Sequence, residues 1–308
     1  MNPGTDQHNA PIELIGGTKR CALLWCMAGT TPRARAIGAE LRRAREDAGL
    51  SARTLATRLG VAHTTVGRWE SGERSPRPTD VAAVLGALGA DHELREELIE
   101  LSRNTDGRHW VASGLPEQKR QLAALLELER DAARIVNVSS LLIPGLLQTS
   151  GYARAIIGGG GVPSGEVETR VAVRIGRRDV IMRRSRPAEL LAVIDETALR
   201  RNIGGPAVMA EQLQALDEAS RWGNVTLRAI PESAGWHPAL EGPFDLLEFS
   251  DRTSVVQIEN RRSALFFHEA VDVEAYQQAL DRVQDIAMSP EATQELIADV
   301  LGDLETTG

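Results

Sequence analysis

Thr64, Thr65 and Arg68 are hydrogen-bonding side chains that lie close together in the sequence. The stretch around them, residues 51–77, is typical of two short helices joined by a tight turn, which places the three side chains on an exposed face of the second helix. Hydroxyl and guanidinium groups on such a face are suited to recognition through hydrogen bonds. The arrangement predicts a helix-turn-helix, an element that lays one helix in the major groove of DNA and crosses the backbone with the other.

The residues around these three carry the local signals of that motif. Ser51 can cap the first helix by accepting a backbone N–H bond, and Gly60 tolerates the positive φ of a sharp turn. Gly72 is expected to end the second helix, and the prolines at 76 and 78 prevent its continuation. The residues predicted to form the apolar core of the motif are Leu55, Ala56, Leu59, Val66 and Trp69.

The charge of this segment differs from that of the remaining chain. Residues 33–77 hold 10 Arg and 5 acidic residues, a net of +5, whereas residues 78–308 hold 36 Asp+Glu and 23 Lys+Arg, a net of −13. The first 32 residues sum to zero, which recovers the total of −8. Because arginine neutralises phosphate, the basic segment favours a DNA contact surface. The alternative is an ordinary solvated helix face.

Helices are also expected at 36–48, 79–88 and 91–101, which makes five helices in a small domain. We therefore predict an all-α five-helix DNA-binding domain at residues 33–105, preceded by a flexible arm at 1–32. A linker is predicted at 106–120, where Gly114 and Pro116 act as breakers.

These residues resemble the phage-repressor (Xre-like) type of helix-turn-helix domain. The matching features are the pair Leu55-Ala56, the turn Gly60 and the run Glu70-Ser71-Gly72-Glu73-Arg74-Ser75-Pro76. The resemblance implies an ion pair between Arg45 of the first helix and Glu70 at the end of the recognition helix.

The resemblance also implies the DNA contacts. The base-reading residues are expected to be His63, Thr64, Thr65 and Arg68. The phosphate contacts are expected to be Ser51, Arg53 and Arg74. Many relatives carry glutamine after the cap of the second helix, whereas this chain has Ala52-Arg53, so the operator cannot be inferred from them.

Residues 121–308 predict a mixed α/β (α+β) domain with short strands. Helices are expected at 117–135, 150–157, 166–184, 206–219, 271–287 and 291–304, and strands at 136–142, 190–194, 225–230, 244–249 and 254–259. The glycines at 158–161 are interpreted as a loop, because no Lys-Ser or Lys-Thr follows them as in a phosphate-binding loop.

This second region resembles the domain that follows the helix-turn-helix in actinobacterial regulators of the WhiJ type. The matching segments are 143–155, 171–181, 193–205, 208–220, 242–251 and 255–260. The resemblance implies an antitoxin-like member of a two-gene pair, linked to development or antibiotic control, whose partner is a small protein encoded by a neighbouring gene.

Two alternatives stay open for the second domain. A one-component sensor would bind a small molecule, and the possible ligand or partner region is Arg174, Arg177, Arg178, Trp236 and His237. An enzyme is the weaker alternative, with Asp195, Glu196 and His237 as its candidates. His268-Glu269 lacks the second histidine of a zinc-protease motif, and no G-x-S-x-G occurs. We therefore expect no catalytic residue, metal or cofactor.

Cys21 and Cys26 are the two cysteines of the chain. They exclude a disulfide framework and favour a reducing, cytoplasmic compartment, with the protein at the nucleoid when it is bound to DNA. The apolar run at 21–28 faintly resembles a signal peptide but is short, and no apolar run is long enough to span a bilayer. We expect a homodimer, joined through the second domain, that reads two half-sites of double-stranded DNA.

Overall fold

The computed structural model describes residues 31–103, 109–111, 115–260 and 264–307. The predicted arm at 1–32, with Cys21 and Cys26, therefore lies almost wholly outside the described residues. Five helices come first: α1 (Pro32–Asp47), α2 (Ala52–Leu59), α3 (His63–Glu70), α4 (Pro78–Leu88) and α5 (His92–Ser102).

Local sequence signals fix the ends of these helices. The Thr31 side chain accepts a bond from the N–H of Ala34, and Asp91 caps α5 in the same way. Pro32 and Pro78 occupy first-turn positions, where the missing N–H of proline costs nothing. The buried core of this all-α domain is formed by Ile37, Leu41, Leu55, Val66, Trp69, Val81, Leu85 and Leu98.

The rest of the described chain is a mixed α/β domain with a seven-stranded sheet in the order β1-β7-β6-β5-β2-β3-β4. Its strands are β1 (His109–Val111), β2 (Arg134–Ser139), β3 (Glu189–Asp195), β4 (Val225–Ile230), β5 (Phe244–Glu248), β6 (Val255–Glu259) and β7 (Ala264–Phe267). β2, β3 and β4 run parallel, and the other neighbouring pairs are antiparallel. Parallel strands need long crossovers, which the intervening helices supply.

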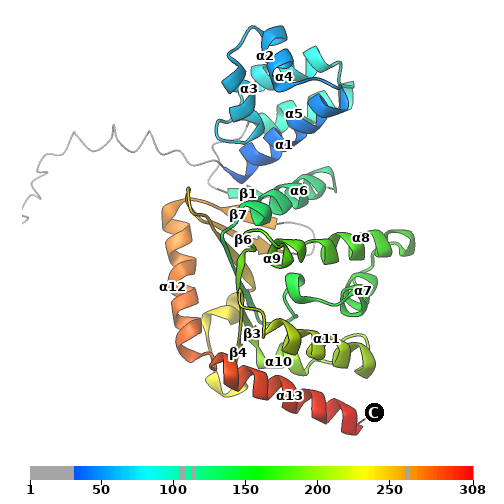
Figure 1. The fold of residues 1–308 in the computed structure, drawn as a ribbon, viewed down its shortest axis with the longest axis vertical. Coiled ribbons are helices and arrows are strands. Elements are labelled where there is room, and N and C mark those ends of the chain that lie inside the picture. Colours follow the sequence, from blue (N-terminus) through cyan, green and yellow to red (C-terminus); the bar gives the residue numbers. More distant parts are fainter. Residues whose placement is uncertain (1–30, 104–108, 112–114, 261–263, 308) are drawn as a thin grey trace, which may run out of the picture.

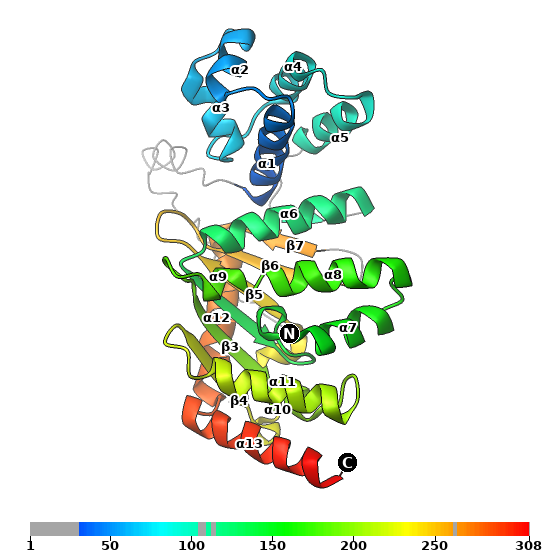
Figure 2. The same cartoon turned by 45° about the vertical axis from the view of Figure 1, so that its right-hand side comes forward.

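The helices cover the two faces of the sheet unequally (Figures 1 and 2). On one face lie α6 (Leu115–Asp131), α7 (Ser150–Gly159), α8 (Ser164–Gly176), α9 (Asp179–Met182), α11 (Pro206–Ala219) and α13 (Pro290–Thr307). The other face packs on α12 (Ala270–Ile286) through Val273, Leu280 and Val283. Alternate strand residues enter the two cores: Ile135 and Ala192 face the first set of helices, and Val136 and Leu191 face α12.

The structure corrects several element bounds. The helix expected at 117–135 begins at Leu115 and ends at Asp131, because the next residues already belong to β2. The single helix expected at 166–184 is wrong: it is broken into α8 and α9 at residues 177–178. The segment predicted as a linker, 106–120, contains β1 and the start of α6. Within the described residues, no helix combines the length and the apolar character that crossing a membrane requires.

Candidate DNA-binding interface

The turn between α2 and α3 follows from three local features. The Ser51 hydroxyl accepts a 3.1 Å bond from the N–H of Thr54 and so caps α2. Gly60 ends α2 with a φ of 66°, a left-handed conformation that other residues rarely adopt. Val66 and Trp69 then anchor α3 in the core and turn its opposite face to solvent.

The exposed face of α3 consists of His63, Thr64, Gly67 and Arg68. Thr65 belongs less fully to this face, because it is half-buried. The resemblance implies His63, Thr64, Thr65 and Arg68 as base-reading residues, and Thr65 is the least exposed of the four.

Gly67 is a part of this face that sequence reasoning missed. It is exposed, and a Cβ added there would meet nothing within 4 Å. A glycine in a helix interior is unfavourable by about 0.5–1 kcal/mol relative to alanine. Its position between Thr64 and Arg68 leaves a bare strip of backbone, which allows a close approach to another surface.

Arg68 and Glu73 form a loose ion pair on the rim of this face. Arg68 Nε lies 3.6 Å from Glu73 Oε1, and the two side chains are 57% and 64% exposed. Exposed pairs of this kind contribute little to stability, so Arg68 can exchange Glu73 for another acceptor at low cost.

The expected phosphate contacts flank α3. Arg53 on α2 and Arg74 after α3 are both exposed. Ser51 is also exposed, but its hydroxyl is engaged in capping α2 and lies 2.8 Å from the Thr54 hydroxyl. Ser51 therefore positions the start of α2 as well as offering a hydroxyl to a ligand.

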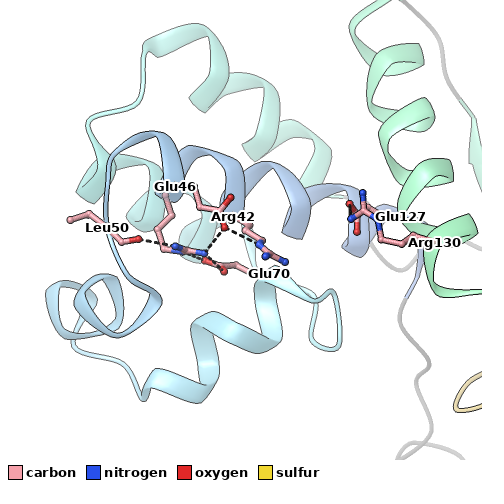
Figure 3. Close-up of polar contacts among 7 residues, drawn as sticks. Arg42, Glu46, Leu50, Glu70, Glu127 and Arg130 are labelled. Atoms are coloured by element: carbon pink, nitrogen blue, oxygen red, sulfur yellow. Dashed lines mark hydrogen bonds and ion pairs between the residues drawn. The ribbon is translucent and has the colours of Figure 1, made fainter. Parts of the chain in front are cut away.

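Arg45 and Glu70 form a two-bond ion pair that joins α1 to the end of α3 (Figure 3). Arg45 Nε donates to Glu70 Oε1 at 2.7 Å, and Nη2 donates to Oε2 at 2.9 Å. Nη1 of the same guanidinium donates to the Leu50 carbonyl at 2.7 Å, which also holds the loop before α2. The hydrogen bond to Glu70 raises the pKa of Arg45. Both side chains are nearly buried, which makes the pair far more rigid than a surface ion pair.

Two glycines let α1 and α3 approach each other closely. A Cβ on Gly38 would come within van der Waals radius of the Trp69 carbonyl oxygen, and a Cβ on Gly72 would meet the Arg35 backbone at 2.9 Å. Gly72 also has a φ of 70°. The exposed face of α3 is thus fixed to α1 by backbone contact as well as by Arg45.

α1 also packs on α6 of the second domain. Arg35 Nη1 lies 2.5 Å from Asp131 Oδ2 at the end of α6, and Arg252 Nη2 lies 3.1 Å from the same oxygen. Arg252 is itself stacked on the Phe249 ring at 3.8 Å. The Asp131 carboxylate therefore joins the DNA-binding domain to the turn between β5 and β6.

A groove of about 860 Å³ lies beside this contact. Residues that line it include Arg42, Glu46, Glu70, Glu127, Arg130 and Asp251, several of which are shown in Figure 3. Glu127 and Arg130 of α6 pair with each other at 2.9 Å. The lining carries both signs of charge and favours no single class of ligand.

The possible ligand residues of the second domain occupy different environments. Arg177 donates to both oxygens of the buried Glu129, at 3.0 and 2.6 Å. Arg178 donates to the carbonyls of residues 146 and 148, and Arg174 donates to the Gln148 amide at 3.3 Å. Trp236 is 68% exposed, whereas the neighbouring His237 is only 3% exposed.

His237 lies against Asp195 at the end of β3, with 3.2 Å between Nε2 and Oδ2. Asp195 also accepts bonds from the N–H and the hydroxyl of Thr197, at 2.8 and 2.6 Å. Both members of the pair are buried. Among the residues that the structure describes, no three His, Cys, Asp or Glu side chains are grouped as metal ligands would be.

Comparison with protein families gives two matches. Residues 36–98 match the model described as "Helix-turn-helix domain". Residues 122–299 match the model described as "Domain of unknown function (DUF5753)", which covers more than half of the chain. Comparison with curated proteins gives no match, and comparison with solved structures gives none either. The chain therefore belongs to the family described as "Domain of unknown function (DUF5753)" and carries an N-terminal helix-turn-helix domain, which supports a DNA-binding regulator.

Proposed function

We propose that this protein is a sequence-specific transcriptional regulator that binds double-stranded DNA as a homodimer. The observation that carries the proposal is the exposed face of α3, with His63, Thr64 and Arg68 around the bare Gly67. The Arg45–Glu70 pair and the close contact with α1 hold this face in a fixed orientation. Preorganised hydrogen-bonding groups on a rigid helix suit readout of base edges in the major groove.

The homodimer is proposed because of the small area that a single helix-turn-helix module covers on DNA. One helix-turn-helix module buries limited surface on DNA, so tight specific binding usually needs two modules. We propose that the second domain provides the contact between protomers and that the two α3 helices enter half-sites one or more helical turns apart.

Two kinds of control are proposed for the second domain. The resemblance to WhiJ-type regulators favours a small protein encoded by a neighbouring gene. A small-molecule sensor is favoured by a different observation, a set of incompletely satisfied polar groups on the sheet face beneath α8, described below. In either case α6, a helix of the second domain, contacts α1 of the DNA-binding domain.

The test is DNA binding by the purified full-length protein to a fragment from upstream of its own gene, at several salt concentrations, with and without the product of the adjacent gene. We expect salt-sensitive binding that exceeds binding to a scrambled fragment. Arg68→Ala should reduce this preference, whereas Arg103→Ala should keep it. Arg103 is a comparably exposed arginine directly after α5, a helix that lies across the domain from α3 (Figures 1 and 2). Equal binding to all fragments by the unaltered protein would reject sequence-specific recognition.

A further inference from the structure

A row of three polar side chains crosses the face of the sheet that α6 and α8 cover. Asp245 on β5 is the register partner of Asn137 on β2 and of Gln257 on β6. Register partners on neighbouring strands point to the same face, with their Cβ atoms about 5 Å apart. Asn137, Asp245 and Gln257 therefore lie side by side on a face whose other strand residues are mostly apolar.

The hydrogen bonds within this row are incomplete. Asn137 Nδ2 donates to one oxygen of Asp245. The Asn137 Oδ1 and Gln257 Oε1 atoms are buried without a hydrogen-bond donor, and Gln257 as a whole is only 4% exposed. Buried acceptors without a donor are costly, so this row is poised to receive a group that donates hydrogen bonds.

The helices do not seal the row. Asn137 and Asp245 keep intermediate exposure although both lie on central strands of the sheet. Arg174 of α8 and Arg177, the C-cap of that helix, are also only partly buried. Solvent therefore reaches part of the row, although the two unpartnered oxygens themselves are covered.

Arg177 is the cation with the largest effect on Asp245, but both oxygens of Glu129 already accept hydrogen bonds from it. Burial raises the pKa of Asp245 to about 7; Arg177 and the bond from Asn137 lower it, whereas Glu129 and Glu259 raise it further. The Asp245 carboxylate thus needs a proton or another cation beside it.

Arg174 supplies a second positive charge in the last turn of α8. It lies one turn before Arg177 at the end of α8, and Glu259 is close enough to influence its charge. Within the described part of the chain its hydrogen bond is to the Gln148 amide oxygen, at 3.3 Å, and it forms no ion pair. A partly buried guanidinium without a carboxylate partner is a ready contact for an anionic group.

We propose that this row binds a small zwitterion of the α-amino-acid class. The ammonium group donates to Asp245 and to the unpartnered oxygens of Asn137 and Gln257, and the carboxylate accepts from Arg174. This inference rests on the proposed function: it names the α-amino acids as the class of ligand that the small-molecule sensor binds. Binding itself does not depend on DNA recognition and can be measured without DNA.

The experiment measures ligand-dependent unfolding temperature and calorimetric affinity with the full-length protein and each of the twenty common L-amino acids, at about 10 mM in the unfolding screen. We expect at least one amino acid to raise the unfolding temperature, and its N-acetyl derivative to have no effect. Asp245→Asn and Arg174→Gln should each weaken its affinity at least tenfold. The matched controls Glu189→Gln and Arg170→Gln replace exposed residues of β3 and α8 and should leave the affinity unchanged.

A second readout is the pH dependence of binding. An ammonium ligand binds the ionised carboxylate and competes with the Asp245 proton, so the affinity should rise about tenfold between pH 6 and pH 8 if the pKa is about 7. This rise should vanish in Asp245→Asn.

Three results would overturn the proposal: no stabilisation by any of the twenty amino acids, undiminished affinity in Asp245→Asn, or equal binding of the N-acetyl derivative. None of them would affect the DNA-binding assay, so failure of this site and failure of the proposed regulator are distinguishable.

Discussion

Arg53 and Arg68 are both exposed arginines of the helix-turn-helix, but they lie on different helices. Arg68 lies on α3 and is proposed to read a base, whereas Arg53 lies at the start of α2 and is proposed to contact a phosphate. We expect Arg68→Ala to cost about 1–3 kcal/mol and to relax the preference at one base pair. We expect Arg53→Ala to weaken binding to all sequences alike and to lower the salt slope by about 1.

The measurement for this pair is binding of both variants to a set of operators that each differ at one base pair, over a range of salt. A uniform loss on every operator from Arg68→Ala would contradict its role in base recognition. A loss confined to one base pair from Arg53→Ala would contradict its role at a phosphate.

Asp245 makes a separate prediction about stability. Its pKa is raised to about 7 in the folded protein, above the 3.8 of an ordinary aspartate, so the folded state binds more protons than the unfolded state between these two pH values. The free energy of unfolding should therefore fall as the pH rises through this window. Asp245→Asn removes the penalty of the buried charge and should stabilise the protein by a few kcal/mol, on the order of its pKa shift, at pH 8.

Urea unfolding of both proteins at pH 5 and pH 8 measures this effect. Because the carboxyl of Asp245 is still largely protonated in the folded state at pH 5, the gain should be clearly smaller there. A gain that is the same at both pH values would show that Asp245 does not carry the proposed charge penalty.

At the scale of helices, α1 acts as the support of α3. The Arg45–Glu70 pair is nearly buried and makes two hydrogen bonds, and removing one partner leaves the other charge unpaired. We expect Glu70→Ala to destabilise the DNA-binding domain by about 3–5 kcal/mol, more than it alters sequence preference. A double-mutant cycle with Arg45→Ala should give a clear coupling energy in chemical unfolding. Independent, additive effects of the two changes would reject the pairing.

Two helical glycines test the close packing of α1 and α3. Gly38→Ala places a Cβ against the Trp69 carbonyl, and we expect it to destabilise the domain by about 1–3 kcal/mol. Gly67→Ala is the matched control, because its Cβ meets open space, and it should stabilise α3 by about 0.5–1 kcal/mol. Thermal unfolding of the two variants should therefore shift in opposite directions. Equal shifts would mean that the helices can move apart at no cost.

The elements that sequence reasoning found are those whose signals are local. The caps, the turn glycine and the periodic apolar residues define α2 and α3. The strands expected at 244–249 and 254–259 correspond to β5 and β6. β1 was missed because its three residues lie among breakers and pair with β7, more than 150 residues later. The break between α8 and α9 was missed because Arg177 turns toward Glu129 on α6.

The candidate sites show the same difference between local signals, which the sequence reveals, and contacts between distant segments, which it does not. The exposed face of α3 could be predicted from the spacing of its polar residues. Gly67 was missed because it has no side chain that could indicate a contact. The polar row could not be predicted, because its three members come from strands that are neighbours only in the sheet. His237 was named from its sequence context as a possible ligand or partner residue, and the structure shows it buried against Asp195.

At the scale of the whole molecule, α6 links the surroundings of the polar row to the DNA-binding domain. Glu129 holds Arg177 beside the polar row, and two residues later Asp131 holds Arg35 of the DNA-binding domain. We expect Asp131→Asn to loosen the orientation of the two helix-turn-helix domains in the proposed dimer. Affinity for a fragment with two half-sites should fall several-fold, because a flexible pair of modules gains less from its second contact. Affinity for a single half-site should stay the same.

Glu127→Gln is the control. Glu127 lies on the same helix, and among the described residues it pairs with Arg130 of α6. Band-shift titrations on the two kinds of fragment measure the difference. A loss on single half-sites as large as on paired ones would assign Asp131 to folding of the DNA-binding domain rather than to its orientation.

The bond between Arg35 and Asp131 has a consequence for how DNA affinity is measured. It is ionic and partly exposed, so dissolved salt weakens it along with the contacts to phosphate. The loss of affinity on adding salt is commonly converted into a number of displaced counterions. In this molecule part of the number of counterions will come from the Arg35–Asp131 ion pair, which does not contact DNA. The Asp131→Asn variant should therefore give a smaller number, which reflects the contacts to phosphate alone.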